Sequence, residues 1–357
     1  MSVARWVSDR VATTAVHLDA AACGRPSEAV LAEVAAHARL EAERGGYVAE
    51  VLADERVAAG RAALGALVGL GAPDVVFSES GGAQFATLLD AWPLPRGARI
   101  GTVAGEYGGN ARVLRDRAGH RGWELVLLET DDLGRVTEVP PGLDLVTLPQ
   151  VASQRGVAQP VEELLAEGVP VLLDVAQSAG QTPLPEGAAA YVGTSRKWLC
   201  GPRGVGWAAV DPAWHDRLAD PPTLGPTVYD DLRRLDSTEA HVAGRVGLAL
   251  AARTWTPALL PVLQTAAQAA RVLLEGAGGW QVVEPLAEPT GITTLHHRSA
   301  DPAATRDALV RDGFVVSAVP VSRADDLAAP LLRVSTAAWT TPGDLEALAG
   351  ALQRHTI

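Results

Sequence analysis

The most informative stretch of this sequence runs from Val169 to Gly206 and reads VPVLLDVAQSAGQTPLPEGAAAYVGTSRKWLCGPRGVG. It contains two short apolar runs, Val169–Asp174 and Tyr191–Thr194, and each ends in a polar residue. The apolar residues of each run are successive rather than alternating, which is typical of strands buried on both faces of a largely parallel sheet. Ligands of open α/β sheets bind at the carboxyl ends of such strands, so these polar residues are candidates for a site.

Similar apolar runs occur on both sides of this stretch, from about residue 75 to about residue 210, and they alternate with helical patterns. This alternation predicts an α/β layer architecture. The further strand candidates are Val75–Glu79, Arg99–Val103, Glu124–Leu128, Asp144–Leu148 and Val205–Val210.

The remainder of the chain predicts helices at the N-terminal end and an α+β region at the C-terminal end. Pro26-Ser27 opens a helix that Gly45-Gly46 interrupts before a second one. We expect a large domain over residues 19–250 and a smaller α+β domain formed by residues 1–18 and 251–357. The elements predicted towards the C-terminus are helices at Ala240–Thr254 and Ala258–Leu274, strands at Gln281–Glu284, Gly291–His296, Phe314–Val319 and Leu331–Ser335, and helices that begin near Asp301 and Thr341.

The amino-acid composition excludes several functional and structural classes of protein. With 48% hydrophobic and 20% charged residues, the 357-residue chain is typical of a globular protein. Its formal charge of −12 argues against nucleic acid or an anionic membrane as the main partner. Two cysteines, Cys23 and Cys200, make neither a disulfide framework nor a metal site. The N-terminus has no apolar signal segment and no run is long enough to span a membrane, so we expect a soluble, cytoplasmic protein.

One residue stands out from the basic residues. Of the 30 lysines and arginines, only Lys197 is a lysine. Arginine replaces lysine wherever a positive charge is sufficient, but it cannot act as an amine nucleophile. Burial and the neighbouring Arg196 both favour a lowered pKa and hence a nucleophilic neutral amine at Lys197. The alternative is a surface lysine that has not been replaced, which we consider less favoured for the only lysine of a chain.

Two further segments complement this lysine. Asp174 ends a predicted buried strand, where a carboxylate needs a cationic or hydrogen-bonding partner, although it could also cap the next helix. Ser80 to Ala83 lie between a strand and a helix, a place suited to a phosphate or simply to a tight turn. Pyridoxal 5′-phosphate (PLP) needs an amine for its Schiff base, an acid at its ring nitrogen and a phosphate cradle, so the three segments together indicate PLP.

The chain resembles the class V aminotransferase and cysteine desulfurase family of fold-type I PLP enzymes over nearly its whole length. Asp174-Val-Ala-Gln177-Ser resembles D-G-A-Q-S of that family, and Thr194-Ser-Arg196-Lys197 resembles S-x-H-K. The resemblance implies that Lys197 carries PLP, that Asp174 contacts the ring nitrogen and Gln177 the ring hydroxyl, and that Thr194 and Arg196 bind the phosphate. It also implies a large domain with a mostly parallel central sheet and a smaller α+β C-terminal domain.

Three other motifs add cofactor contacts. His17-Leu-Asp-Ala-Ala-Ala resembles the early Y-L-D-N-A-A motif, and Ser80-Gly81-Gly82-Ala83-Gln resembles S-G-A-T-E, whose residues cradle the phosphate. Glu106-Tyr107-Gly-Gly-Asn resembles E-H/Y-x-x-N, which implies that Tyr107 stacks on the ring. In the segment that aligns with V-S-N-E-T-G-x-x-x-P, Ser153 stands where the family has an asparagine near the PLP hydroxyl.

The resemblance also implies substrate and partner contacts. Leu332-Arg333-Val-Ser resembles the late R-x-S motif, whose arginine binds the substrate α-carboxylate bidentately. Ser237-Thr238 lies where the family carries a G-T that reaches the phosphate of the partner subunit, which implies a homodimer with shared active sites. Tyr47 is a candidate for the substrate mouth, and the alternative is a packed helix residue.

The positions of the two cysteines limit which reaction of this family the chain can catalyse. A cysteine desulfurase of this family needs a thiolate on a loop shortly before the R-x-S motif, and Val315–Leu327 contains none. The segments TSRKWLCGPRGVG and STEAHVAGRVGL resemble most the carbon–sulfur lyases that act on an S-substituted cysteine sulfoxide. We therefore expect a PLP-dependent carbon–sulfur lyase that acts by β-elimination, with an aminotransferase or epimerase as alternatives. A non-catalytic PLP-sensing regulator needs a fused DNA-binding domain, for which we find no basic segment.

Overall fold

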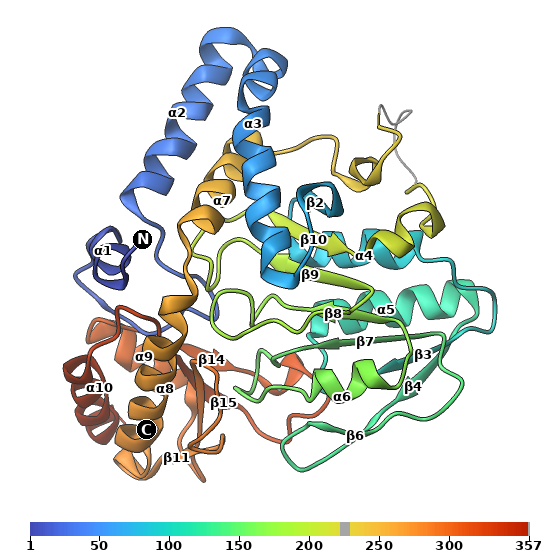
Figure 1. Cartoon of the computed structure of the whole chain (residues 1–357). Helices are drawn as coiled ribbons and strands as arrows, with labels where there is room; N and C mark the ends of the chain where they lie inside the picture. The colour runs from blue at the N-terminus through green and yellow to red at the C-terminus, as the bar shows by residue number, and fades with distance from the viewer. Residues whose placement is uncertain (222–228, 356–357) are drawn as a thin grey trace.

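The structure is a computed structural model that describes residues 1–221 and 229–355. Its centre is a seven-stranded sheet with the order β2-β10-β9-β8-β7-β3-β4 (Figure 1). Strand β10 is antiparallel to both of its neighbours and the other pairs are parallel, which confirms the predicted, mostly parallel sheet. The strands are β2 (Val75–Ser78), β3 (Arg99–Thr102), β4 (Glu124–Leu127), β7 (Leu145–Pro149), β8 (Val171–Asp174), β9 (Ala190–Thr194) and β10 (Gly206–Val210).

Helices cover both faces of this sheet because successive strand residues point to opposite sides. Leu173 of β8 packs in one apolar core together with residues of helices α3 (Gly46–Gly65), α6 (Val161–Ala166) and α7 (Val242–Thr254). Leu172 packs on the other face, in a core shared with α4 (Gly81–Ala91) and α5 (Gly108–Arg121). Strand β4 departs from the predicted double-sided burial because it forms the edge of the sheet, and its residues are partly or fully exposed.

The two helices predicted at the N-terminal end form a hairpin that projects from the top of the molecule in Figure 1. Helix α2 (Glu28–Arg44) begins at Ser27, whose hydroxyl accepts a hydrogen bond from the Val30 N–H. Gly45 then has a φ of 87°, a conformation that favours glycine, and α3 starts at the next residue. The Gly-Gly pair therefore makes the turn of the hairpin.

A second, antiparallel sheet with the order β11-β12-β15-β14 lies in the C-terminal part. Its strands are β11 (Gln281–Val282), β12 (Ile292–His296), β14 (Ser317–Val319) and β15 (Leu331–Ser335). The predicted strand Phe314–Val319 is divided at Val316, and its first part, β13 (Phe314–Val315), pairs instead with β1 (Val16–His17). The helices of this part are α8 (Leu260–Leu274), α9 (Pro302–Arg311) and α10 (Pro342–His355).

Short elements without a clear sequence pattern complete the fold. Trp6 of α1 (Val3–Ser8) packs in a core with residues such as Trp198 and Trp339, which come from both main parts of the chain. The predicted domain limits at residues 18 and 250 stay a prediction. The remaining elements are β5 (Glu129–Thr130), β6 (Val136–Glu138) and the 3₁₀ turns η1 (Ala66–Val68), η2 (Ala72–Asp74), η3 (Pro212–Arg217), η4 (Leu232–Leu235), η5 (Pro257–Leu259), η6 (Ala277–Gly279) and η7 (Val321–Arg323).

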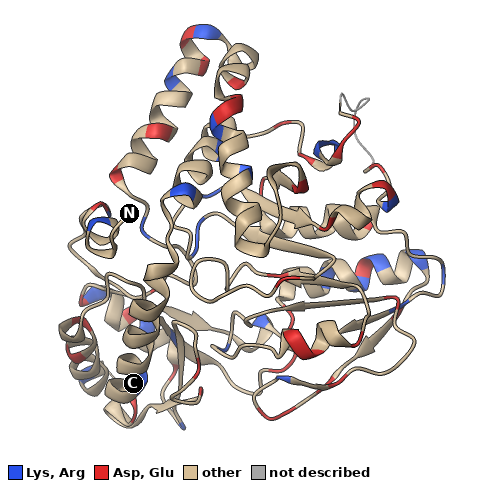
Figure 2. Cartoon of the chain, in the orientation of Figure 1, with Lys and Arg blue, Asp and Glu red and all other residues tan. Residues whose placement is uncertain are grey.

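The charged residues are mixed in sign along the outer helices, as Figure 2 shows for α2 and α5. Among the described residues, no single helix is long and apolar enough to cross a membrane. Helix α7 and the segment Pro257–Leu274 pass that test only as a pair, by length and composition, and the pair is bent by 68°.

Candidate active site

A cavity of about 310 Å³ opens at the carboxyl ends of β7, β8 and β9, where the sequence predicts a site. It gathers most of the predicted site residues from segments far apart in the sequence. Its lining residues are Ala21, Ala22, Ser80, Gly81, Gly82, Tyr107, Asn110, Pro149, Val151, Ser153, Asp174, Ala176, Gln177, Thr194, Arg196, Lys197, Ser317, Arg323 and Arg333.

Lys197 lies three residues beyond the end of β9, on a turn that closes tightly. The Cys200 N–H donates to the Lys197 carbonyl oxygen at 3.0 Å, and the Gly24 N–H donates to the Arg196 carbonyl oxygen at 2.7 Å. A Cβ at Gly24 would overlap the Lys197 carbonyl oxygen, so only glycine fits there. The early HLDAAA segment and the lysine turn are therefore locked together.

The Lys197 amine is set up to be neutral near pH 7. Burial lowers its pKa from 10.5 to about 7, against the opposing attraction of the Asp174 carboxylate. Arg196, Arg333 and Arg323 add repulsion that also lowers this pKa. The predicted environment of a nucleophilic lysine is thus present, with more arginines than the sequence alone suggested.

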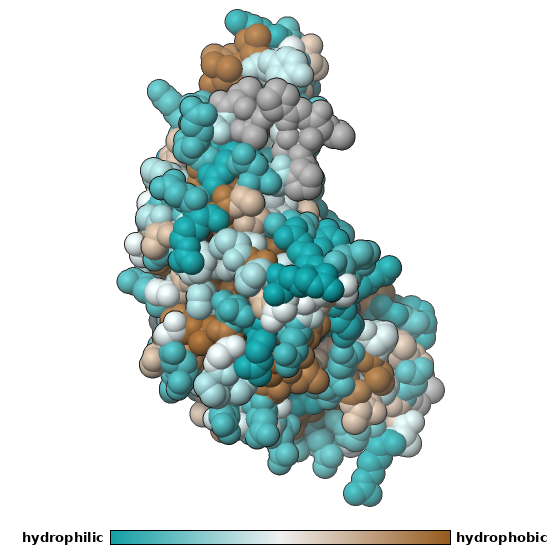
Figure 3. Space-filling view, turned by 90° about the vertical axis from the view of Figure 1, so that its right-hand side faces the viewer, coloured by the Kyte–Doolittle hydropathy of each residue, from teal (hydrophilic) through white to brown (hydrophobic). Residues whose placement is uncertain are grey.

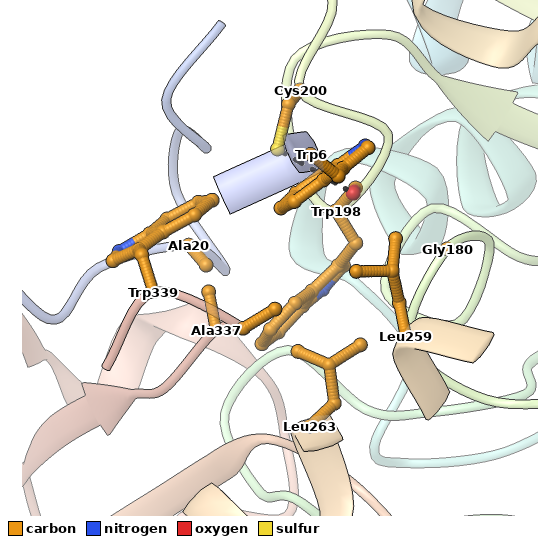
Figure 4. Close-up of a pocket in the computed structure, with 10 residues that line it drawn as sticks. Trp6, Ala20, Gly180, Trp198, Cys200, Leu259, Leu263, Ala337 and Trp339 are labelled. Carbon is orange, nitrogen blue, oxygen red and sulfur yellow. Dashed lines mark hydrogen bonds between the residues drawn. The ribbon is translucent and has the colours of Figure 1, made fainter. Parts of the chain in front are cut away.

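Behind the lysine turn, aromatic packing fixes the backbone. Trp198 does not line the cavity and instead belongs to an apolar cluster (Figure 4), in which Trp6 and Trp339 stack with their ring centroids 6.0 Å apart. This cluster surrounds a gap of only about 10 Å³, which is the size of a packing defect rather than of a ligand site. Cys200 is buried here with a φ of 58°, and burial raises the pKa of its thiol to about 12. A thiol with so high a pKa stays protonated near neutral pH and is a poor nucleophile.

Asp174 ends β8 and faces the same cavity. Its Oδ1 accepts a hydrogen bond from the Ala176 N–H and its Oδ2 accepts one from Asn110 Nδ2, both at 2.7 Å. No helix follows it, so the alternative of a helix cap is wrong. Burial raises the pKa of Asp174, while Lys197 and these hydrogen bonds lower it. A carboxylate in this setting needs a further positive partner, and a protonated ring nitrogen would supply one.

A second buried carboxyl, Glu106, was not recognised from the sequence. Its Oε1 accepts from the Tyr107 N–H at 2.7 Å and from Asn110 Nδ2 at 3.3 Å, so Asn110 bridges Glu106 to Asp174. Its Oε2 is buried without a hydrogen-bond partner among the described residues. Burial and, less strongly, Asp174 raise the pKa of Glu106 to about 8. The EYGGN motif contained this pair, but only Tyr107 was interpreted.

The segment Ser80 to Ala83, which is predicted to bind the phosphate, forms the N-terminus of helix α4. Ser80 is the N-cap of α4, and its hydroxyl accepts from the Ala83 N–H at 3.1 Å. Ala83 therefore uses its amide within the turn and does not line the cavity. A Cβ at Gly82 would meet no atom within 4 Å, so its backbone is open towards the cavity. The free amides at this helix N-terminus, with Thr194 and Arg196 also lining the cavity, suit a phosphate.

Arg333 on β15 is held in place but retains an unused donor. Its Nη1 donates to the Ser153 carbonyl oxygen at 2.8 Å, and its Nη2 contacts Asp19 Oδ1 at 3.2 Å. The side chain is 5% exposed, yet its Nε has no partner among the described residues. The guanidinium lines the cavity, where its positive charge suits an anion. Ser153 thus contributes its backbone, while its hydroxyl donates to Gln154 at 3.4 Å.

Gln177 lines the cavity with a side chain that the protein already orients. Its Nε2 donates to the Ala21 carbonyl oxygen and its Oε1 accepts from Trp198 Nε1, both at 3.1 Å. Tyr107 starts α5 and is 38% exposed, so one face of its ring remains accessible.

Besides Ala83, two predicted site residues do not line the cavity of their own chain. Tyr47 is 87% exposed at the tip of the α2–α3 hairpin, so the alternative of a packed helix residue is wrong. Thr238 is exposed next to Ser237, whose N–H donates to the Phe77 carbonyl oxygen. Their roles at a shared site stay predictions. Three polar lining residues were not assigned a role from the sequence. Asn110 is the last residue of the EYGGN motif, of which only Tyr107 was interpreted, whereas Ser317 and Arg323 belong to no quoted motif.

Comparison with known proteins places this arrangement among characterised folds. No protein-family model matches the chain. A Mycobacterium tuberculosis (strain CDC 1551 / Oshkosh) protein named "Probable hercynylcysteine sulfoxide lyase" is 40% identical over 376 aligned positions, covering 99% of this chain and 93% of that protein.

Two solved structures share the fold at lower identity. The apo cysteine desulfurase of Thermococcus onnurineus NA1 gives a TM-score of 0.89 at 18% identity, with 100% of this chain and 98% of that chain covered. The cystine C–S lyase C-DES, in complex with its reaction product cysteine persulfide, gives 0.85 at 17% identity, with 97% and 99% covered.

Proposed function

This chain belongs to the class V aminotransferase and cysteine desulfurase family of fold-type I PLP enzymes, and we propose that it is a PLP-dependent carbon–sulfur lyase. The observation that carries the proposal is the composition of the cavity. Lys197, with a pKa near 7, shares the cavity with Asp174. The segment 315–327, which lines the cavity through Ser317 and Arg323, holds no cysteine to relay sulfur.

The proposed substrate is hercynylcysteine sulfoxide, after the name of the relative that is 40% identical. In the overall reaction the bond between Cβ and sulfur breaks and the sulfur leaves as a sulfenic acid, which a reductant then converts to ergothioneine. The cysteine carbon skeleton takes up water and ends as pyruvate and ammonia. Support for the finer substrate assignment comes only from this likeness.

Three residues of the cavity are assigned roles in the chemical step. When bound, PLP supplies an electron-accepting ring that makes the substrate Cα–H acidic. The Lys197 Nζ, whose lowered pKa favours the neutral amine, would take the Cα proton as general base. Asp174 would hold a proton on the ring nitrogen by its negative charge, and Asn110 orients that carboxylate.

Binding is assigned to the remaining polar residues. Arg333 lines the cavity and would hold the substrate α-carboxylate, with Ser153 and Asp19 keeping the guanidinium in place. The amides of Ser80 to Gly82, together with Thr194 and Arg196, would bind the phosphate. Tyr107 would stack on the ring and Gln177 would contact the ring hydroxyl.

We further propose a homodimer with shared active sites. Tyr47 and Thr238 are both exposed and absent from the cavity of their own chain. They lie at the same end of the molecule, because Ala53 of α3 packs against Val242 and Val246 of α7. A partner chain that covers this end would bring both residues towards its own site.

The test combines cofactor and product analysis. Purified protein should show the visible absorption of bound PLP, and borohydride should fix the cofactor to Lys197 by mass spectrometry. Incubation with hercynylcysteine sulfoxide, beside simple cysteine conjugates, should release pyruvate and ammonia. A keto acid that retains the sulfur side chain, together with pyridoxamine phosphate, would instead establish transamination. We expect Lys197→Ala to abolish both the fixed cofactor and turnover, and Asp174→Asn to retain PLP but lose most activity.

A further inference from the structure

Arg323 is a cation of the cavity whose charge is not neutralised by the protein. It ends η7, between β14 and β15, and its guanidinium carbon lies 5.9 Å from the centroid of the Tyr107 ring. Within the described part of the chain, this guanidinium forms no ion pair and no hydrogen bond. The two acidic residues that follow it are engaged elsewhere: Asp325 with Arg115 at 2.8 Å and Asp326 with Arg155 at 3.6 Å.

Arg323 lines the same cavity as Lys197 and Arg333. Its positive charge is among the smaller causes that lower the pKa of both groups, in agreement with this position. Arg323 nevertheless belongs to a different element from either, and it approaches the cavity from the Tyr107 side.

The charged residues that line the cavity leave Arg323 without an anionic partner. Four cationic side chains line it, against one carboxylate, Asp174. The PLP phosphate accounts for Arg196, and the substrate α-carboxylate together with Asp19 accounts for Arg333. Lys197 is the base. A half-buried guanidinium without an anionic partner is unfavourable, and its planar fork suits a carboxylate.

We propose that Arg323 binds a second carboxylate, carried on the group attached to the substrate sulfur. The inference rests on the proposed lyase function and defines its substrate class as S-conjugates of cysteine, or their sulfoxides, with an anionic S-substituent. The hercynyl group meets this requirement because it is an amino-acid betaine with its own carboxylate. Arg323 then selects the leaving group, whereas Arg333 recognises the amino-acid part that all substrates share.

The experiment compares two conjugates of the same shape and different charge. S-(2-carboxyethyl)-L-cysteine sulfoxide and S-(2-carbamoylethyl)-L-cysteine sulfoxide differ only by a distal carboxylate or amide. For the parent holoenzyme we expect a higher kcat/KM for the carboxylate. In Arg323→Gln the ratio of the two kcat/KM values should fall about 10- to 100-fold, the value of a charge-assisted hydrogen bond. Arg323→Lys should retain part of the ratio, since it keeps the charge but not the fork.

Arg115→Gln is the matched control. Arg115 also lies beside the 321–327 segment through its ion pair with Asp325, but it does not line the cavity. This variant removes one positive charge from the same region, and we expect the parent ratio of kcat/KM values. A fall equal to that of Arg323→Gln would mean that only the general positive field matters, which would overturn the proposal.

Other outcomes also decide the question. Equal turnover of both conjugates by the parent enzyme, or an equal loss for both in Arg323→Gln, would refute a distal carboxylate site. Weaker PLP binding by Arg323→Gln, measured by absorption titration of the apoprotein, would assign Arg323 to the phosphate instead. If the parent releases no pyruvate from either conjugate, the lyase function fails.

The carbon analogues keep the proposal testable in that case, because they cannot undergo β-elimination. In 2-aminopimelate and its distal amide, a methylene group replaces the sulfur. Calorimetry should show tighter binding of 2-aminopimelate to the parent holoenzyme and no such preference in Arg323→Gln. Equal binding of the two analogues by the parent would overturn the assignment.

Discussion

At the scale of single residues, burial moves the pKa of two groups in the cavity region in opposite senses. Burial lowers the pKa of the Lys197 amine to about 7 and raises that of the Glu106 carboxyl to about 8. Near neutral pH, in the protein without its cofactor, Glu106 is therefore mostly neutral and a substantial fraction of Lys197 is neutral as well. Asn110 links Glu106 to Asp174 by hydrogen bonds to both side chains. A protonated Glu106 is neutral, so it places no negative charge beside the Asp174 carboxylate.

The raised pKa of Glu106 gives a stability prediction. The unfolded chain loses this proton near pH 4.5, whereas the folded chain keeps it until about pH 8. The folded state binds more protons between these values, so the contribution of Glu106 to stability falls as the pH rises through that window. Glu106→Gln keeps the acceptor for Tyr107 and Asn110 but carries no charge. We expect it to raise the melting temperature of the apoprotein at pH 8 relative to the parent, with little difference at pH 4.5.

The matched control is Glu346→Gln, which replaces an exposed glutamate of α10. Its difference from the parent should not change with pH in the same way. Thermal melts at both pH values decide the point, and an equal effect of Glu106→Gln at pH 4.5 and pH 8 would contradict a neutral Glu106.

At the scale of elements, the site depends on the contact between the turn that carries Lys197 and the segment around Gly24. Gly24 has no room for a Cβ against the Lys197 carbonyl oxygen and Cys200. The contact joins the segment before α2 to the loop after β9, and neither segment shows it in its sequence pattern. A change at Gly24 must therefore displace the backbone of the lysine.

We expect Gly24→Ala to lower stability by about 1–3 kcal/mol or more and to reduce the amount of PLP that the protein retains, because the extra methyl group overlaps backbone. Gly119→Ala in α5 is the matched control, since a Cβ there meets nothing within 4 Å and alanine favours a helix. Denaturant unfolding and the absorption of bound PLP measure both variants. Normal PLP retention by Gly24→Ala would show that the turn tolerates the shift.

The same elements show what the sequence could reveal. The buried strands were predicted within one or two residues, because apolar runs bounded by turns fix them locally. Helix α10 was predicted to begin near Thr341, and the structure confirms this start with the reciprocal hydrogen bonds of Thr341 and Asp344. Strands β1 and β13 have two residues each, too few for a pattern, and exist only because they pair across 298 positions.

The site residues also fall into two groups, those that sequence motifs identify and those that only the fold brings together. Lys197, Asp174 and Arg333 belong to motifs and were identified, and all three line the cavity. Arg323 belongs to no motif, and it reaches the cavity only because the fold brings η7 there. Asn110 belongs to the EYGGN motif, but its hydrogen bond with Asp174 is a tertiary contact that the motif does not show.

At the scale of the whole molecule, the α2–α3 hairpin presents apolar side chains to solvent. Figure 3 shows hydrophobic colour at the top of the molecule, where this hairpin lies. Exposed apolar groups that gather on one projecting element are typical of an interaction surface. We infer that a second copy covers this tip in the proposed homodimer. The residues concerned are Tyr47, Val48, Val51 and Leu52.

Val51→Asp should weaken the homodimer, since Val51 is 75% exposed in the single chain and a carboxylate there would be buried by the partner. We expect a shift towards monomer in sedimentation analysis at low protein concentration, with an unchanged circular dichroism spectrum. Val310→Asp on α9 is the control, because Val310 is also exposed but lies outside the hairpin. A dimer of unchanged strength in Val51→Asp would place the interface elsewhere.

Because the chain has a single lysine, proteolysis can measure the fraction of the protein that carries its cofactor. A lysine-specific endoproteinase can cut the denatured chain at one bond only, after Lys197, into residues 1–197 and 198–357. Where reduction has fixed PLP to that amine, the cleavage site is lost and the chain stays whole. The proportion of intact chain on a gel therefore reports the fraction of molecules that carried the cofactor, without any spectroscopic calibration.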